Sequence, residues 1–469
     1  MGYTIRANSH TLFLLPPSLD ELVPADHLVR FICKLVDSLD LEALGFQVLK
    51  GEFGRPPYAA DLFVKAFVWG HAFGVHSRRA LERASYENVS LMWLLGWNHP
   101  DHSSLARFFR QNKEALRKLF RRVVWVAKRS GLVGQSVYAV DGTKIQSQAS
   151  TEKAWHRGKL EKEWEALEAA TEAEMVAWEA AEEAGERYEL PENLRDVGEQ
   201  QKAIQRAMTE LKEVEREHLH PAEREARVMK VRKAGLALAY NAQVVSDAKN
   251  QLIVAADVVN DENDSGQLVH MIEEAVENVG GAPEETVADS GYMSGKALSM
   301  AEELGYSVVV AIRKETGEGK KHHRAQFKYD PSRDVVVCPE AKELGFERIK
   351  DRGEGREECR LYRCRNGDIC PHRSECSKDP GGRSISIGPY EGAIERQKEK
   401  QQHGDKRGLL ARRKVIVEPV FAQIKERMGL RRFLVRGLEA VRAEWALACT
   451  AYNLRKLHKH WLARTLVLA

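Results

Sequence analysis

Residues 137–150 read VYAVDGTKIQSQAS. Val137, Ala139 and Val140 have the pattern of a buried strand, and we expect that strand to end at Asp141. Asp-Gly is also a common turn dipeptide, so Asp141 alone is compatible with a simple turn. The alternative is a metal ligand at the edge of a sheet. Deciding between the two requires partner residues elsewhere in the chain.

The overall composition sets only broad limits. The chain has 469 residues, which is too long for one compact domain, so we expect two to four structural units. Lys and Arg number 72 against 69 Asp and Glu, and this near-balance identifies no partner by itself. No apolar run reaches the roughly 18–20 residues that span a bilayer, and the N-terminal patch LFLL is too short for a signal-peptide core. We therefore expect a soluble cytoplasmic protein.

The first part of the chain is expected to be helical. Apolar side chains recur at helical spacing from about residue 25 onward, and we place a helical domain at 15–130. Five arginines fall on its short helices: Arg78, Arg79, Arg107, Arg110 and Arg117. A small DNA-binding bundle would use such a basic surface, whereas an all-helical structural domain would simply present it to solvent. This segment alone does not separate the two interpretations.

Residues 151–231 differ in character from what precedes them. They are rich in Glu, Ala, Lys and Arg, a composition typical of long helices. We expect two or three helices, with breaks near Gly185, Pro191 and Pro221, that form a helical, coiled-coil-like insertion. The default role of such an arm is a solvated spacer or a contact between two copies of the chain.

From residue 236 the hydrophobic period becomes two. The segment LALAYNAQVVSDAKNQLIVAADVVND (236–261) predicts a β-hairpin, and SGQLVHMIEEAVENVG (265–280) predicts a helix with a Gly stop. EETVADSGYMSG (284–295) predicts a short strand before a further helix, and YSVVVAIR (306–313) predicts another strand. These elements alternate as in an α/β domain.

Two interruptions, 151–231 and 314–413, separate the segments 136–150, 232–313 and 414–464. The three segments together are about the size of one domain. Their elements follow in the order strand, strand, strand, helix, strand, helix, strand and then helices. This is the order of an RNase H-like α/β core, which we predict as the catalytic core. The second interruption would then be a small cysteine-rich insertion.

Three carboxylates occupy informative places in this core. We expect Asp141 to end the first strand, Asp289 to end the fourth, and Glu418 to lie early on the helix after the second interruption. Oxygen ligands suit Mg²⁺, and two ions roughly 3.5–4 Å apart can assist in-line displacement at a phosphodiester. Singly, Asp289 is equally a helix cap and Glu418 a first-turn carboxylate. Asp264 follows the third strand, and we expect it to cap the next helix rather than to lie behind the metal ions.

Several motifs together resemble the DDE transposases of bacterial insertion sequences. The motifs are HPDHSSLARFFRQN (99–112), VDGTKIQSQAS (140–150), AYNAQVVSDAKNQLIVAADVVNDENDSGQL (239–268), VADSGYMSG (287–295) and VEPVFAQIKERMGLRRFLVRG (417–437). The first resembles the end of that family's N-terminal helical domain, and the second, fourth and fifth its two Asp motifs and its Glu motif. The resemblance implies that Asp141, Asp289 and Glu418 bind two Mg²⁺ ions, for which Mn²⁺ can substitute.

The resemblance extends to basic residues around Glu418, with one departure. Lys425 matches the family's Glu-x6-Lys spacing and is expected to contact a DNA phosphate. Related transposases often carry a Tyr and an Arg ahead of the Glu, the Arg four residues before it. Here that position is Lys414, with Arg413 beside it, and the Tyr position is Ala411. Lys still serves as a point charge for phosphate, but the contribution of the Tyr is in doubt.

The positive charge of the chain is concentrated near Glu418. Residues 396–436 hold 13 Lys and Arg against 4 Asp and Glu, which suits a polyanion better than a solvated helix face. We expect DNA contacts from Lys414, Lys425, Arg413, Arg431, Arg432, Arg107 and Arg110.

Five of the seven cysteines fall within the second interruption. Cys338, Cys364, Cys370 and Cys376 are expected to form a tetrahedral Zn²⁺ site that resembles the family's cysteine-rich knuckle, with Cys359 and His372 as alternative ligands. The gaps of five residues are looser than a standard Cys-x2-Cys pair, and ordinary reduced thiols are the other interpretation. Cys33 and Cys449 fall in apolar helical contexts and are expected in the core.

The leading hypothesis is a Mg²⁺-dependent transposase that binds double-stranded DNA at the terminal inverted repeats of its element. It would cut there and join the freed 3′-hydroxyl to target DNA. Binding two ends implies a homodimer or higher assembly in the DNA complex, in a bacterial cytoplasm and at the nucleoid. The alternatives are an RNase H-like nuclease without strand transfer and an inactive, transposase-derived DNA-binding protein.

Overall fold

The structure is a computed structural model. It describes residues 18–47, 57–184, 196–312, 321–353, 357–365, 370–379 and 381–463. The chain forms two compact units. Unit 1 comprises Met1–Gly134, Gly142–Glu262 and Glu418–Ala469, and unit 2 comprises Gln135–Asp141 and Asn263–Val417.

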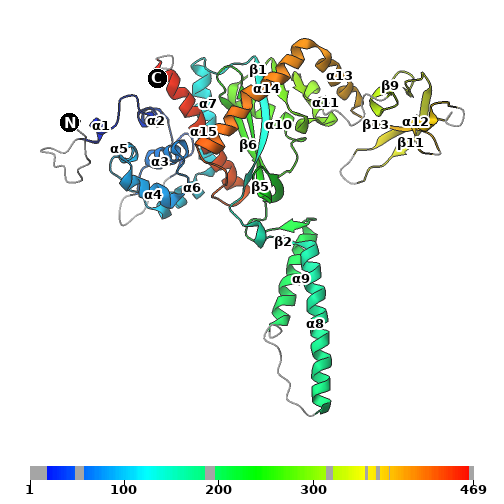
Figure 1. Cartoon of the computed structure of the whole chain (residues 1–469). Coiled ribbons are helices and arrows are strands. Elements are labelled where there is room, and N and C mark those ends of the chain that lie inside the picture. Colours follow the sequence, from blue (N-terminus) through cyan, green and yellow to red (C-terminus); the bar gives the residue numbers. More distant parts are fainter. Residues whose placement is uncertain are drawn as a thin grey trace, which may run out of the picture. The chain divides into compact units, whose positions relative to one another are not determined.

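The N-terminal part of unit 1 is helical, as predicted. Its helices are α1 (Leu19–Leu22), α2 (Leu28–Asp37), α3 (Ala60–Phe73), α4 (Arg78–Glu87), α5 (Val89–Leu94), α6 (His102–Gln111) and α7 (Lys113–Arg129). Side chains of Ser77, Asn88 and Asp101 accept hydrogen bonds from first-turn amides and start α4, α5 and α6. The long C-terminal helix α15 (Leu438–Leu462) packs against α2, α3 and α7, so both ends of the chain share one apolar core (Figure 1).

The strands of unit 1 form antiparallel hairpins. The strands are β4 (Arg227–Val231), β5 (Gly235–Asp247) and β6 (Ile253–Val259), with β4 and β6 both paired to β5. The Asp247 carboxylate accepts the backbone amides of Lys249, Asn250 and Leu252, which closes the turn between β5 and β6. The predicted hairpin is therefore confirmed. Strand β4 was not expected, because its five residues carry two exposed or half-exposed cations that obscure the alternation.

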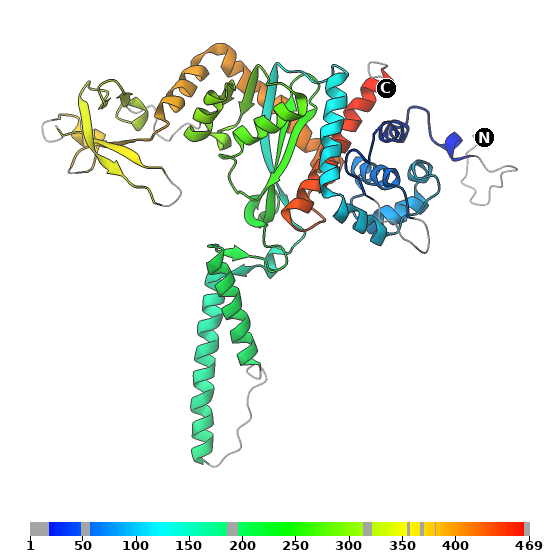
Figure 2. The same ribbon diagram turned by 180° about the vertical axis from the view of Figure 1, so that it is seen from behind.

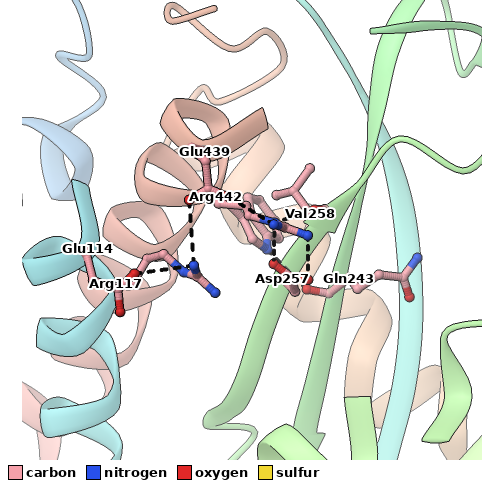
Figure 3. A network of polar contacts seen from close by, with 8 residues as sticks. Glu114, Arg117, Gln243, Asp257, Val258, Glu439 and Arg442 are labelled. Carbon is pink, nitrogen blue, oxygen red and sulfur yellow. Dashed lines mark hydrogen bonds and ion pairs between the residues drawn. The ribbon is translucent and has the colours of Figure 1, made fainter. Parts of the chain in front are cut away.

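Helix α15 is tied to this sheet by buried polar contacts. Arg442 lies 3.0 Å from the Asp257 carboxylate and donates its Nε to the Val258 carbonyl, also at 3.0 Å (Figure 3). Asn453 donates to the Ile253 carbonyl at 2.8 Å and accepts the Ile253 amide at 2.9 Å. The partners of Arg442 are buried, as are Asn453 and Ile253, and Arg442 itself is only partly exposed, so these bonds fix the position of α15 along β6.

The first interruption is a helical hairpin, as predicted. Helices α8 (Arg157–Ala184) and α9 (Val197–Glu213) pack side by side, next to the short 3-10 helix η1 (Thr151–Lys153) and the two-stranded ribbon of β2 (Trp155–His156) and β3 (His218–Leu219) (Figure 2). A small apolar cluster of Leu160, Ala207, Leu211 and Leu219 holds its base. The breaks expected at Gly185 and Pro191 lie outside the described residues, and near Pro221 the helices have already given way to β3.

Unit 2 contains the parallel part of the fold. Its elements are the first half of β1 (Val137–Gln146), α10 (Leu268–Val279), β7 (Glu285–Ala288), the 3-10 helix η3 (Ser290–Tyr292), α11 (Gly295–Glu303) and β8 (Val308–Val310). Strand β1 pairs in parallel with β7, and β7 with β8. The sheet order is β4-β5-β1-β7-β8, with β6 on β5, so the sheet is mixed. The prediction that the first strand ends at Asp141 was wrong, because β1 continues to Gln146 as part of unit 1.

The second interruption folds as a small antiparallel sheet followed by helices. Strands β9 (Lys328–Asp330), β10 (Val335–Val337), β11 (Glu343–Lys350), β12 (Cys359–Arg363) and β13 (Ser384–Ile387) pair in the order β13-β12-β11-β10-β9. The short elements η4 (Arg324–Gln326) and α12 (Arg373–Cys376) flank them, and α13 (Glu391–Gln402), α14 (Gly404–Ala422) and the π-helix η6 (Gln423–Arg427) follow. In the part of the chain that is described, no helix is both long and apolar enough to cross a membrane.

The start of α14 corrects a prediction about Glu418. We expected this residue early on its helix, but α14 begins at Gly404 and Glu418 lies four residues before its last residue, Ala422. Apart from its two glycines, the stretch GDKRGLLARR consists mostly of residues that favour a helix, so the helix starts earlier than predicted. A first-turn role for Glu418 is thereby excluded.

Candidate active site

Two predicted ligands, Asp141 and Asp289, lie at matching points of neighbouring strands in unit 2. The parallel register pairs Val140 of β1 with Ala288 of β7, and each aspartate follows its partnered residue directly. Parallel strands present their carboxyl ends at one edge, so the register places the two residues next to each other. Asp289 also caps η3, since its Oδ1 accepts the amide of Gly291 at 2.7 Å. The cap and ligand interpretations of Asp289 are therefore compatible.

A third carboxylate, Asp264, belongs to the same cluster. A Cβ atom built on Gly291 would lie 2.9 Å from Asp289 Oδ1 and 3.3 Å from Asp264 Oδ2, so both carboxylates border this glycine. The expectation that Asp264 caps the next helix was wrong. The N-cap of α10 is Gln267, and no side chain caps that end.

Tyr292 is buried among these carboxylates. Its side chain is fully shielded from solvent. Burial raises the pKa of Tyr292 well above its usual value, and the nearby charges of Asp264, Asp141 and Asp289 raise it further. The three carboxylates therefore all lie within electrostatic range of one phenol in unit 2. A cation there would relieve their mutual repulsion.

Arg413 supplies a positive charge to this cluster. Its Nη1 lies 2.7 Å from Asp141 Oδ2, and both side chains are mostly shielded from water. The position four residues before Glu418, Lys414, is exposed instead. The arginine one residue earlier therefore approaches the carboxylate, because it is the one on the inward side of α14.

Glu418 and Lys425 lie in the part of the chain that returns to unit 1. Glu418 is exposed on α14, five residues after Arg413. Lys425 lies in η6, where its ammonium donates to Thr143 Oγ1 and, at 3.1 Å, to the Lys144 carbonyl. Burial, helped by the charge of Arg232, lowers the pKa of Lys425 to about 8. Its ammonium is thus oriented by β1, and its contact with a DNA phosphate stays a prediction.

The other predicted DNA contacts are surface residues of unit 1. Arg107 and Arg110 are exposed on α6. Arg431 forms an ion pair with Glu426, and Arg432 Nη2 lies 3.3 Å from Gln146 Oε1. Nothing in these positions tests their role in DNA binding.

Two of the five arginines assigned to the N-terminal basic surface are engaged inside unit 1. Arg78 lies over the Phe109 ring at 4.5 Å, and its largely buried guanidinium interacts with Glu444. Arg117 forms ion pairs with Glu114 and Glu439 (Figure 3). These two arginines contribute to packing rather than to an open basic face.

The four cysteines predicted to bind zinc line one cavity of unit 2. The cavity has a volume of about 390 Å³ and is bordered by Cys338, Cys364, Cys370 and Cys376. Burial raises the pKa of the Cys376 thiol, and the other three thiols are close enough to raise it further. The alternative ligand Cys359 lies instead at the start of β12, where Arg352 Nη1 approaches its sulfur at 3.7 Å.

The same cavity holds a second group of ligand atoms. His322, Glu340 and His372 place one nitrogen or oxygen each within 4.8 Å of one another. His322 Nε2 lies 3.0 Å from Glu340 Oε1, and His372 Nε2 lies 3.8 Å from Glu340 Oε2. Thiolate and imidazole donors suit Zn²⁺, so the residues present fit this metal. Lys321 also reaches Glu340 Oε1, at 2.8 Å, and neutralises part of its charge.

Sequence reasoning missed Tyr292, Arg413 as the partner of Asp141, and His322 as the neighbour of His372 in the cavity. Tyr292 was visible only as part of the ADSGY motif, which carries no indication of burial. His322 precedes the cysteines along the chain, and the segment of η4, β9 and β10 that separates it from Glu340 gives no recognisable ligand spacing.

Two segments of the chain match known domain families. Residues 17–111 match a transposase domain (DUF772), and residues 337–458 match a transposase DDE domain. The first covers helices α1–α6, and the second contains Glu418 and the four cavity cysteines. Asp141 and Asp289 lie outside both matched segments. No curated protein matched the chain.

Proposed function

Because the chain belongs to the DDE transposases of insertion sequences, we propose that it cuts DNA at the ends of its own element and joins them to target DNA. The supporting observation is the cluster in unit 2, where Asp141, Asp264 and Asp289 surround Tyr292 beside Arg413. Partly buried carboxylates gathered in this way favour the binding of a cation, and they lie in a chain whose family acts on DNA.

In this proposal Asp141, Asp289 and Glu418 would hold two Mg²⁺ ions. These ions would lower the pKa of bound water and stabilise the negative charge that develops at the phosphate. The oxygen of water forms a bond to phosphorus at the element end while the bond to the 3′ oxygen breaks. The freed 3′-hydroxyl then attacks a target phosphodiester, whose own bond to a 3′ oxygen breaks. Arg413 orients Asp141, and the Gly291 amide orients Asp289.

The proposal assigns supporting roles to the remaining parts. Helices α2–α7 and the basic residues near Glu418 bind the terminal repeats, and the hairpin of α8 and α9 is the candidate contact between copies in a homodimer or larger assembly. We further propose that Cys338, Cys364, Cys370 and Cys376 bind a structural Zn²⁺. The antiparallel sheet beside this cavity has a small apolar core, and a metal would stabilise it.

The test is cleavage of a labelled duplex taken from the DNA that flanks the reading frame, in Mg²⁺ and in Mn²⁺. We expect cuts at one discrete end and strand-transfer products, both lost in Asp289→Asn. The matched control is Asp405→Asn, an exposed carboxylate in the first turn of α14, which should retain activity.

Each departure from this result identifies a different function. Discrete cuts without joined products would favour a nuclease, and specific binding without cuts in either metal would favour a DNA-binding protein. Cleavage that survives in Asp289→Asn would contradict the assigned ligands.

A further inference from the structure

A basic pocket of about 440 Å³ lies in unit 1, formed by residues far apart in the chain. The start of α2, the end of α3, the π-helix η6 and the last turns of α15 contribute to it. Four cations line it: Arg427, Arg455, Lys456 and Lys459. All of its lining residues belong to unit 1, whereas Asp141 and Asp289 belong to unit 2. The pocket is thus a different site from the carboxylate cluster.

The four cations of this pocket outnumber the acidic groups near them, which are Asp26 in its lining and Asp247 near Lys456. Arg455 donates to the Ala72 carbonyl at 2.8 Å and Lys456 to Gln251 Oε1 at 2.9 Å, both neutral acceptors. Within the described ranges, Arg427 and Lys459 are exposed and have no acidic partner at ion-pair distance. Burial lowers the pKa of Lys456, and the neighbouring Lys459 lowers it further. Four cations gathered around one pocket suit an anionic ligand.

The wall of the pocket is aromatic. The Phe73 ring is 39% exposed and stacks on His27, with ring centroids 5.9 Å apart and an interplanar angle of 4°. His458 Nε2 lies 2.9 Å from the Asp26 carbonyl, which holds the start of α2 against α15. Asp26 is the single acidic side chain among the described residues that line the pocket. Four cations beside an exposed ring suit a ligand that has both phosphate and a flat apolar surface.

We propose that this pocket binds phosphodiester groups of the DNA backbone, with Arg427 and Lys459 as the contacting cations and Phe73 against the adjoining sugar or base. The proposal rests on the proposed function, since DNA is the polyanion that a transposase must hold. It extends the binding surface beyond the segment 396–436 that sequence reasoning emphasised, because Arg455, Lys456 and Lys459 come from the end of α15.

The experiment measures DNA affinity of the full chain by fluorescence anisotropy at several salt concentrations between 50 and 200 mM. Each lost phosphate contact makes the negative slope of log K against log salt shallower by about 0.9. We expect this slope to become shallower by roughly 1 to 2 in Arg427→Gln/Lys459→Gln. The change should be equal for flanking DNA and for an unrelated duplex. Phe73→Leu should weaken binding several-fold while leaving the slope unchanged.

The matched control is Lys162→Gln/Lys202→Gln, which removes two exposed cations from α8 and α9 with the same change in net charge. An unchanged slope in the pocket variant, or an equal loss in the control, would overturn the proposal. Inorganic phosphate and AMP provide a further arm. If either ligand binds tightly in a manner that depends on Arg427, and its presence does not change the affinity for DNA, the pocket belongs to a free ligand instead.

The outcome is separable from that of the proposed function. A wild-type protein that cuts flanking DNA, with a pocket variant that keeps the full salt slope, would contradict the pocket alone. Failure of the wild-type protein to bind any duplex would contradict both.

Discussion

Arg413 lies beside Asp141, one of the proposed metal ligands in the carboxylate cluster. Its guanidinium lies 2.7 Å from Asp141 Oδ2. A cation bound by Asp141 and Asp289 would meet this positive charge at close range. The arginine therefore opposes cation binding and favours the approach of a phosphate. Its removal should strengthen metal binding and weaken DNA binding.

We expect Arg413→Gln to bind Mn²⁺ roughly fivefold more tightly, since removal of a like charge at this range is worth about 1 kcal/mol in a screened site. DNA affinity should fall in the same variant. Titration calorimetry with Mn²⁺ measures the first effect, and Arg412→Gln, its exposed neighbour on α14, is the control. Unchanged Mn²⁺ binding would show that Arg413 does not act on the metal site, and weaker binding would show that it acts by orienting Asp141 rather than by charge repulsion.

Gly291 leaves space for the Asp289 carboxylate. The Cβ of an alanine there would lie 2.9 Å from Asp289 Oδ1, closer than such atoms approach one another. We expect Gly291→Ala to displace the carboxylate and to lower DNA cleavage at least tenfold, with little change in the melting temperature. Gly388→Ala is the control, because its added Cβ meets nothing within 4 Å. Full cleavage by Gly291→Ala would argue against Asp289 as a ligand.

At the scale of elements, α15 carries an unusual buried acid. Glu444 is buried in this helix and accepts the Leu434 amide at 2.9 Å. Burial raises the pKa of Glu444 to about 7, although the nearby Arg78 opposes the shift. The unfolded chain loses this proton near pH 4.5, whereas the folded chain keeps it to about pH 7. The folded state therefore binds more protons in this window, and stability falls as pH rises through it.

We expect Glu444→Gln to remove this contribution. Relative to wild type, the variant should gain stability on the order of 3 kcal/mol between pH 4.5 and 7. The comparison uses the difference between the two proteins in urea unfolding, because buried His71, whose pKa is lowered to about 3, acts in the opposite direction. A difference that stays constant with pH would show that Glu444 is ionised in the folded protein.

At the scale of the whole molecule, the two units combine different kinds of stabilisation. Unit 1 has an extensive apolar core shared by the N-terminal helices and α15. Among the described residues, the apolar core of the cysteine-rich sheet of unit 2 is a cluster of six buried side chains: Phe327, Val336, Leu344, Tyr362, Ile385 and Ile387. A core of this size rarely stabilises a fold without a metal or disulfides.

We therefore expect about one equivalent of zinc per chain, and its removal by a chelator should unfold this sheet while α15 and its neighbours stay folded. Zinc analysis and hydrogen exchange provide the two measurements. Cys364 lines the cavity and directly follows strand β12, whereas Cys359 begins that strand and lies away from the cavity. Cys364→Ser should therefore lose the metal, and Cys359→Ser should keep it. Protein that folds fully without metal would contradict this prediction.

The amino-acid pattern alone was sufficient for the kind and order of most elements. Alternation identified β5 and β6, helical spacing identified α2–α7 and α10, and local motifs pointed to Asp141 and Asp289, because these features depend on neighbours along the chain. The extension of β1 past Asp141, the existence of β4 and the early start of α14 required the tertiary structure, since pairing and packing partners decide where an element ends.

The surroundings of each candidate site also depended on the fold. Arg413 contacts Asp141 across 272 positions of sequence, and His322 contacts Glu340 after the chain has passed through η4, β9 and β10. The basic pocket joins α2 to the end of α15. No local sequence pattern encodes these contacts. They form when distant segments bury their apolar faces together and thereby bring particular charged side chains close to one another.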